Sequence, residues 1–341
     1  MQQISITRPD DWHVHFREGL VLEHTVPATA RYFGRALAMP NLAHPLTSVD
    51  ALLAYQARII KAASGYPDFK PYLTFYLNEA VLPETLIAAK KHTFILGGKL
   101  YPAGVTTNSA EGARSIRALY PLFEVMQTND LVLQIHGEVI KGDIFEREAL
   151  FLEKHLKHIM YDFPKLRIVL EHISTKAAVE FVKAAPKTLA ATITPHHLLY
   201  DRNQLLAGGI RPHYYCLPIL KHVRDKEALQ VAATSGNPKF FAGTDSAPHG
   251  KNQKECASGC AGIYSAPFAL SMYAEVFESM CALDKLDQFL GQYGADFYQL
   301  PVSQERITLV REPIQIPEQF NLGQIQVVPV HAGGAFAWSV Q

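Results

Sequence analysis

The chain has 341 residues, enough for one large domain or two of typical size, and 48% of them are hydrophobic, as in an ordinary globular protein. Its 32 basic and 32 acidic residues balance, so net charge gives no reason to expect a nucleic acid or an anionic membrane as partner. No apolar run approaches the roughly 20 residues that span a bilayer, and the segment 1–12 lacks the basic and apolar stretches of a secretory signal.

The cysteines point to a reducing compartment. Four cysteines in a chain of this length do not form a disulfide framework, which favours the cytoplasm. Cys256 and Cys260 could share a metal ion, but no second cysteine pair exists to complete a structural zinc site. We therefore interpret both as free thiols and expect a cytoplasmic protein.

Short β-rich runs alternate with amphipathic helical segments along the chain. Runs such as 131–136 (LVLQIH) and 167–172 (RIVLEH) are nearly continuous in apolar residues, which is typical of strands covered on both faces. Pro83 stands where the first turn of a helix tolerates proline. The predicted strands are 4–7 leading into 13–15, 35–39, 72–77, 94–100, 131–136, 167–172, 189–194 and 240–243. The predicted helices are 49–63, one beginning at Pro83, 114–126, 146–160, 175–185, 225–234 and 267–280.

This alternation predicts an α/β fold, a (β/α)₈ TIM barrel, because most of the strand-like segments are followed by a helix. A doubly wound open sheet is the alternative, which is weakened because no glycine-rich phosphate-binding motif follows the first strand. We find no linker or solenoid repeat and expect a single domain over 1–341. Its last part, about residues 300–341, has alternating apolar runs (ITLV, QIQVVPV, AFAWSV) that predict an accessory C-terminal extension packed on the barrel.

Polar residues stand where the predicted strands end, which is where a barrel of this kind carries its catalytic residues. Alternation along an extended strand places His13 and His15 on one face and Trp12, Val14 and Phe16 on the other. Any one of the histidines alone would more often be a hydrogen-bonded core residue. The strand-end candidates are His13, His15, Arg17, Asn41, Lys99, His136, His172 and Asp245, with His249 four residues after Asp245.

Four histidines, one lysine and one aspartate at a single rim predict a metal site. Nitrogen and carboxylate ligands suit zinc best, with manganese, cobalt or iron as alternatives. Lys99 needs its own explanation, because an ammonium group cannot ligate a metal. It either anchors substrate at the rim or reacts as a neutral amine with carbon dioxide to give a carbamate that bridges two metals. We favour the carbamate, because nearby cations favour the deprotonated amine and its negative charge balances theirs.

Long motifs in a fixed order identify a family that this chain resembles. It is similar over nearly its whole length to the amidohydrolase superfamily, and within it to the short, single-function (class II) dihydroorotases of bacteria. The motifs are RPDDWHVHFREG, AMPN (38–41), KLYPAGVTTNS (99–109), IHGE (135–138), LEHIST (170–175), TPHHL (194–198), HYYCLPILK (213–221) and GTDSAPH (243–249).

The resemblance implies two Zn²⁺ ions per chain in one binuclear centre. One ion would be held by His13, His15 and Asp245 and the other by His136 and His172, with carboxylated Lys99 (N6-carboxylysine) and a hydroxide between them. The resemblance also implies a homodimer and a mobile loop that closes over the site. The residues expected to bind substrate are His15, Arg17, Asn41, Thr106, Thr107, Leu217, His249 and Ala261.

The implied reaction is the reversible hydrolysis of the cyclic amide of (S)-dihydroorotate to N-carbamoyl-L-aspartate, the ring-closure step of de novo pyrimidine (UMP) biosynthesis. Two metals can hold hydroxide at neutral pH and polarise the amide carbonyl, and Asp245 would act as general base and then general acid. The substrate is a small molecule, with no nucleic acid or membrane involved. The alternatives are a hydantoinase-like cyclic-amide hydrolase, a mononuclear deaminase (suggested by IHGE) and a catalytically silent scaffold; Glu138 is left without a catalytic role.

Overall fold

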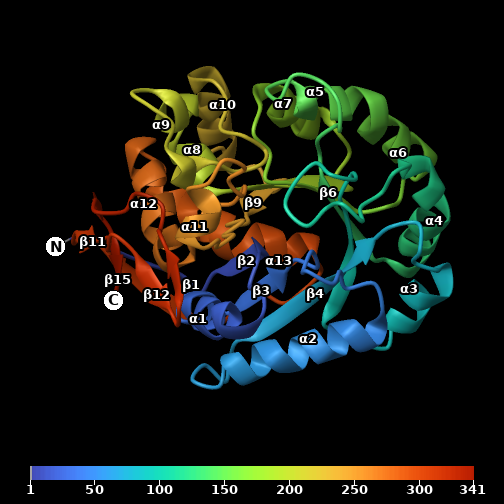
Figure 1. Ribbon diagram of the computed structural model, residues 1–341, viewed down its shortest axis with the longest axis horizontal. Coiled ribbons are helices and arrows are strands. Elements are labelled where there is room, and N and C mark those ends of the chain that lie inside the picture. The colour runs from blue at the N-terminus through green and yellow to red at the C-terminus, as the bar shows by residue number, and fades with distance from the viewer. Residues whose placement is uncertain (1) are drawn as a thin grey trace.

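The protein is described by a computed structural model covering residues 2–341, and its centre is an eight-stranded parallel sheet in the order β2-β3-β4-β5-β6-β7-β8-β9. The sheet closes on itself after β9, because the Asp245 amide donates to the carbonyl of His13 (2.8 Å) and the His15 amide donates to that of Ser246 (3.1 Å). Figure 1 shows the closed ring of strands inside the helices. The strands are β2 (Asp10–Val14), β3 (Arg35–Ala38), β4 (Lys70–Leu77), β5 (Ile95–Leu100), β6 (Val132–His136), β7 (Ile168–Glu171), β8 (Leu189–Ile193) and β9 (Phe240–Ala242).

The predicted (β/α)₈ barrel is confirmed, and each predicted helix is present in whole or in part. The segment 114–126 begins with a 3₁₀ turn before α4, and 146–160 is interrupted by a π-helical turn at Leu152–Leu156. The sequence pattern missed α1, whose apolar residues do not form one stripe and which contains Pro27. The helices are α1 (Gly19–Ala30), α2 (Val49–Ala62), α3 (Pro83–Ala89), α4 (Tyr120–Asn129), α5 (Arg147–Phe151), α6 (Lys157–Asp162), α7 (Lys176–Ala184), α8 (Pro195–Leu199), α9 (Arg202–Leu206), α10 (Val223–Ala233), α11 (Lys251–Lys254), α12 (Ala269–Ser279) and α13 (Tyr293–Phe297).

The strands are buried on both faces. Alternate residues such as Ala36 and Ala38 join the larger core cluster between strands and helices, while Leu37 joins a smaller cluster inside the barrel. The prediction that Trp12 shares a face with Val14 was wrong: Trp12 packs in the inner cluster and stacks on Tyr298 at 4.5 Å. The register of β2 against β3 shifts between Asp11 and Val14, and such a bulge breaks strict alternation.

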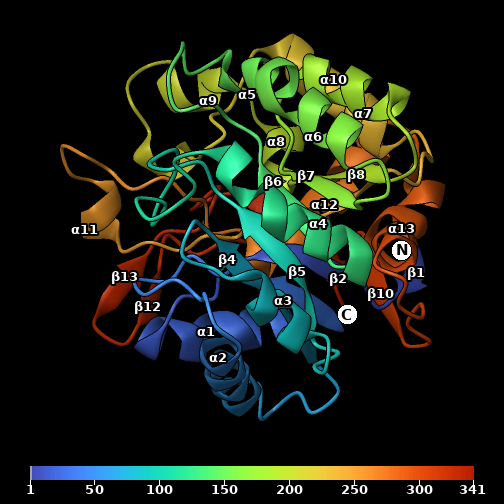
Figure 2. The same cartoon turned by 90° about the vertical axis from the view of Figure 1, so that its right-hand side faces the viewer.

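The first predicted strand is in fact two strands. β1 (Gln3–Thr7) leaves the barrel and pairs antiparallel with β10 (Arg306–Val310), which in turn pairs with β15 (Ser339–Val340). The predicted C-terminal extension is present, and it adds two small two-stranded antiparallel sheets. In Figure 2, β12 (Phe320–Leu322) and β13 (Ile325–Val327) lie beside α1 and α11. The other sheet pairs β11 (Ile314–Gln315) with β14 (Ala335–Phe336) and encloses the first sheet in the chain.

Candidate active site

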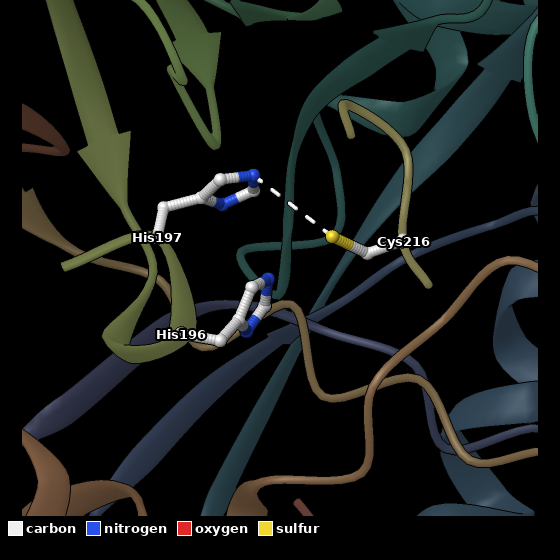
Figure 3. A group of neighbouring side chains, drawn as sticks. All are labelled: His196, His197 and Cys216. Atoms are coloured by element: carbon white, nitrogen blue, oxygen red, sulfur yellow. Dashed lines mark hydrogen bonds between the residues drawn. The ribbon is translucent and has the colours of Figure 1, made fainter. Parts of the chain in front are cut away.

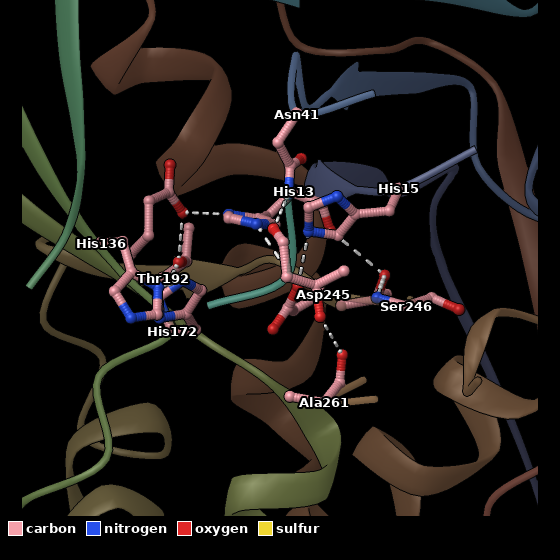
Figure 4. A network of polar contacts seen from close by, with 12 residues as sticks. His13, His15, Asn41, His136, His172, Thr192, Asp245, Ser246 and Ala261 are labelled. Atoms are coloured by element: carbon pink, nitrogen blue, oxygen red, sulfur yellow. Dashed lines mark hydrogen bonds and ion pairs between the residues drawn. The ribbon is translucent and has the colours of Figure 1, made fainter. Parts of the chain in front are cut away.

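The carboxyl ends of the barrel strands bring the predicted metal ligands together (Figure 4). His13, His15 and Asp245 form one group, with Asp245 Oδ1 at 3.4 Å from His13 Nε2 and 3.0 Å from His15 Nε2. Ligand atoms of these three residues lie within 4.8 Å of one another. His136 and His172 form a second group, in which His136 Nδ1 lies 3.2 Å from His172 Nε2. Two donor sets therefore face each other at one rim.

Buried carboxylates fix which nitrogen each histidine turns toward the centre. Glu171 Oε2 lies 2.9 Å from His13 Nδ1 and accepts from Thr192 Oγ1 at 2.6 Å, which leaves His13 Nε2 facing Asp245. Glu138 Oε2 lies 2.9 Å from His136 Nε2, which leaves His136 Nδ1 facing His172. Metal-ligating histidines usually donate their other ring N–H to such a carboxylate. Sequence analysis had assigned no role to Glu138 and had missed Glu171, although each stands next to or close to a candidate histidine.

Lys99 lies inside the barrel on β5 and is fully buried. Among residues 2–341, its Nζ has no hydrogen-bond partner, and the same holds for His13 Nε2 and the hydroxyl of Tyr101. Burial, which disfavours the charged form, lowers the pKa of the Lys99 ammonium to about 8. The pKa of Lys99 is thus shifted toward the neutral amine, and its charge acts on the pKa of His13 and of His172, one residue from each donor group. Its Nζ lies 5.2 Å from the centre of the Tyr101 ring.

Three of the candidates carry unusual backbone geometry. Arg17, His172 and Asp245 all have positive φ angles, of 63°, 41° and 45°. Non-glycine residues adopt this region rarely, and such strain concentrates at functional sites. At His172 the conformation is secured by its amide, which donates to Thr192 Oγ1 at 2.7 Å. The sharp turns after β7 and β9 aim His172 and Asp245 back over the barrel mouth.

A second set of candidates comes from loops above the metal-ligand set. The guanidinium of Arg17 lies 3.0 Å from His249 Nε2. Thr107 Oγ1 donates to the carbonyl of Ala261 (3.1 Å), and Asn41 Nδ2 donates to the carbonyl of Thr107 (3.0 Å). These bonds tie the loop that carries Thr107 across the barrel mouth.

The two sets enclose a small cavity of about 20 Å³. This volume leaves room for about one water molecule, which is too little for a six-membered ring in this conformation. The cavity lining includes the predicted residues His13, His15, Arg17, Asn41, Thr106, Thr107, His136, His172, Leu217, Asp245 and Ala261, and the unpredicted Tyr101, Ala247 and Gly262.

Two predicted residues are not part of this lining. Lys99 lies beneath the lining, and His249 lies behind Arg17 in a neighbouring groove of about 330 Å³. Burial, followed by the nearby Arg17 charge, lowers the pKa of His249 to about 2, so the ring is neutral beside the guanidinium. Tyr101 was missed, although its position two residues after Lys99 on the same strand face was a usable signal.

Comparisons with known proteins agree with this geometry. Residues 10–307 match the model of the amidohydrolase family. A curated protein named dihydroorotase from Nitrosococcus oceani is 52% identical, covering 98% of this chain and 98% of its own length. The chain belongs to the dihydroorotase group of the amidohydrolase family. The resemblance stated from the motifs is confirmed, and with it the expectation of a hydrolase for cyclic amides.

Solved structures place this hydrolase among related barrels. A dihydroorotase from Saccharomyces cerevisiae, in complex with 5-fluoroorotic acid, superposes with a TM-score of 0.93 at 36% identity, covering 100% of this chain and 99% of that one. An L-hydantoinase (dihydropyrimidinase) from Arthrobacter aurescens has a TM-score of 0.78 at 15% identity, covering 99% of this chain and 83% of that one. The second likeness shows a shared fold alone. Among residues 2–341, no helix has the length and hydropathy of a membrane span.

Proposed function

We propose that this chain catalyses the reversible hydrolysis of (S)-dihydroorotate to N-carbamoyl-L-aspartate, the ring-closing step of pyrimidine biosynthesis when run in reverse. One observation carries the proposal: the candidate metal ligands and the guanidinium-bearing Arg17 line the same small cavity. The dihydroorotase name of the full-length relatives and the 5-fluoroorotic acid in the yeast structure support it. Both dihydroorotate and that ligand are pyrimidine rings with a carboxylate.

The donor set fits a pair of zinc ions. Buried nitrogen atoms without a partner in residues 2–341, such as His13 Nε2 and Lys99 Nζ, are costly unless a ligand satisfies them. His13, His15 and Asp245 would hold one ion, and His136 and His172 the other. When bound, two such ions lower the pKa of water and polarise the amide carbonyl.

Lys99 would serve this pair as a carbamate. Its Nζ adds to carbon dioxide and loses one proton, which gives an anion with two oxygen donors. The buried amine, with its pKa lowered to about 8, is suited to this reaction because the neutral form is the nucleophile. The carbamate would replace a buried positive charge by a negative one between two cations, and this supports it over a substrate-anchoring ammonium.

The protein's own side chains supply proton transfer and orientation. Asp245, whose carboxylate lies beside His13 and His15, would accept the proton of the attacking water and deliver it to the amide nitrogen that leaves. Arg17, with Asn41 and His249 beside it, would hold the substrate carboxylate through its planar fork. The backbone near Leu217 and Ala261 would bind the ring, and closure of the Thr106–Thr107 loop would exclude water.

The reaction itself dictates a pH dependence. Opening the ring adds water, creates a second carboxylate and releases one proton. High pH therefore favours hydrolysis and low pH favours ring closure.

The decisive experiment compares substrates on the metal-loaded enzyme. Turnover is measured with dihydroorotate, with N-carbamoyl-L-aspartate, and with uncharged cyclic ureides such as hydantoin, alongside metal analysis of the same preparation. The proposal expects reversible turnover of the first pair and two zinc ions per chain. Preference for the uncharged ureides would overturn it in favour of a hydantoinase-like enzyme, the alternative that shares the fold.

Two further alternatives are disfavoured by particular residues. A mononuclear deaminase would use the glutamate of IHGE at the substrate, but Glu138 lies behind His136 and does not line the cavity. A silent scaffold would have no need of a complete set of buried donors. We further propose a single domain with residues 300–341 as its accessory extension, acting as a cytoplasmic homodimer on small molecules; the family match over residues 10–307 supports the single domain.

A further inference from the structure

A second cluster of metal-binding side chains lies outside the proposed active site. His196 and His197 stand on α8, directly after barrel strand β8, and Cys216 lies in the loop before α10 (Figure 3). All three are buried, with exposed fractions of 0%, 2% and 1%. One ligand atom from each lies within 4.8 Å of the others. None of the three lines the cavity of the proposed active site.

His196 is buried with both of its polar ring atoms unsatisfied by the described part of the chain. Within residues 2–341, neither of its ring nitrogens has a hydrogen-bond partner, although the side chain is fully buried. A buried imidazole without a hydrogen-bond partner is unfavourable, and native proteins rarely tolerate such a group without a water or ion to satisfy it. The centre of the His196 ring lies 4.7 Å from that of His197, and one ligand atom each of His196, His197 and Cys216 lie within 4.8 Å of one another.

The other donors converge on one carbonyl oxygen. Pro218 O lies 3.0 Å from His197 Nε2 and 3.2 Å from Cys216 Sγ, and these two atoms are 4.0 Å apart. At the usual Zn–N and Zn–S bond lengths, ligands of a tetrahedral site are separated by about 3.3–3.6 Å. The three side-chain ligand atoms lie within 4.8 Å of one another, so they would have to move together by about 1–1.5 Å to reach these separations, with Pro218 O as a fourth donor.

We propose that His196, His197, Cys216 and the carbonyl of Pro218 form an additional site for a zinc-class cation, separate from the pair at the barrel centre. Two imidazoles and a thiolate are donors that select zinc over magnesium or calcium. Thr194 supports the arrangement, because its Oγ1 lies 2.7 Å from His197 Nδ1 and can accept the proton there. In the folded chain Nε2 is the nitrogen that donates to the Pro218 carbonyl, so cation binding would require the ring proton to move from Nε2 to Nδ1. Thr194 Oγ1 would then accept that proton, as the hydrogen-bond partners of metal-bound histidines commonly do.

The affinity of this site for a cation is limited because the Cys216 thiol must lose its proton before the sulfur can ligate. Burial lowers the pKa of His197 to about 4, so its ring is neutral at physiological pH, and raises the pKa of the Cys216 thiol to about 12. Binding would form the metal–sulfur bond and release the thiol proton to solvent. The charges of Asp245 and Glu138 add to burial in disfavouring the thiolate, whereas those of Lys254 and Lys221 favour it but oppose the incoming cation. We expect weaker binding than at the barrel centre and affinity that rises with pH.

A cation at this site would stabilise the segment that carries Leu217, one of the proposed substrate-binding residues. Cys216 immediately precedes Leu217, which lines the active-site cavity, and the Gly262 amide donates to the carbonyl of Tyr215 at 2.9 Å. A cation that ties Cys216 to α8 would hold this loop against the barrel.

Cobalt substitution tests the proposal, because a thiolate–cobalt bond gives a strong near-ultraviolet charge-transfer absorption. The six ligands proposed at the barrel centre contain no sulfur, so they cannot produce it. The full-length chain is prepared with the other thiols removed (Cys256→Ser, Cys260→Ser and Cys281→Ser), and Co²⁺ is added after chelation. The proposal expects the band, with a third equivalent of cobalt per chain, and expects loss of both on adding Cys216→Ser. Absence of the band, or its survival in Cys216→Ser, would overturn the proposal.

Two controls keep the test decisive. His196→Asn in the same background leaves the thiol in place and should weaken binding of the third equivalent at least tenfold; unchanged binding would contradict a role for His196. If Cys216→Ser does not fold, zinc-edge X-ray absorption on the variant whose sole thiol is Cys216 takes its place. One sulfur neighbour is then expected, and nitrogen and oxygen neighbours alone would refute the site. The cobalt titration is repeated in Lys99→Ala, which removes a proposed ligand of the barrel centre only. The thiolate–cobalt band should persist there, so failure of the barrel-centre proposal can be told apart from failure of this one.

Discussion

The two halves of the active site are built in different ways. The proposed metal ligands stand on barrel strands or the first residues after them, and their neighbours hold them from behind, as Glu171 holds His13. The proposed substrate-binding residues stand on loops held by single hydrogen bonds, as Thr107 is held to Ala261. The first half is buried and fixed by the closed sheet. The second half is the part that we propose to open for substrate, because the cavity of about 20 Å³ cannot admit a ring.

This difference predicts different consequences of mutation. Changes to the strand-borne half should remove metal and therefore all chemistry. Changes to the loop-borne half should leave the metals in place and alter substrate affinity or selectivity. Metal content measured beside KM and kcat separates the two outcomes for any variant.

The largest effect is expected at Lys99. Lys99→Ala should lose the bridged metal pair and lower kcat by about 10³-fold or more, since metal stabilisation of the transition state amounts to several kcal/mol. Metal analysis and turnover of dihydroorotate check it. Lys254→Ala is the matched control, because Lys254 is also buried but its ammonium donates to the carbonyls of Tyr215 (2.8 Å) and Gly262 (2.6 Å) instead. Two metals and normal turnover in Lys99→Ala would exclude the carbamate.

Substitution of Arg17 should weaken substrate binding and leave the metal content unchanged. Arg17→Lys keeps the charge but loses the planar fork, so kcat/KM for dihydroorotate should fall about 30-fold, or about 2 kcal/mol, mainly through KM. Slow turnover of an uncharged ureide should be unchanged in the same variant. An equal loss of kcat/KM with the uncharged ureide would show that Arg17 has a structural role and does not bind the substrate carboxylate.

Glu138 tests the support behind the metal ligands. Glu138→Gln keeps the size of the side chain but removes the negative charge next to His136 Nε2, so affinity for the metal at His136 and His172 should fall about 10- to 100-fold. Competition with a chelator measures this loss. Glu148→Gln is the control, because Glu148 is similarly buried, but within residues 2–341 its carboxylate accepts from the Ser174 amide at 2.9 Å and from the Thr175 hydroxyl instead of bonding a candidate histidine. Equal losses in both variants would assign Glu138 a structural role only.

The difference between strand-borne and loop-borne residues also determines which parts of the fold and site could be predicted from the sequence. Strand ends such as those at His136 and His172 follow continuous apolar runs, so their common rim could be inferred from the period of the pattern alone. The bulge that turns Trp12 inward and the departure of β1 toward β10 depend on packing between distant segments, which local pattern does not contain. The Thr107–Ala261 contact joins residues 154 positions apart and needed the folded chain or a family likeness to be found.

The smallest effect is expected at the loop itself. Thr107→Val removes the hydroxyl that donates to Ala261 O and should destabilise the closed loop by about 1 kcal/mol, which lowers kcat/KM about fivefold with metal content unchanged. Thr107→Ser restores the hydroxyl and should recover most of the loss. Steady-state kinetics of the two variants measure the contrast. Equal activity in the valine and serine variants would mean that closure does not depend on this bond, and the loop would then be an ordinary connection between β5 and α4.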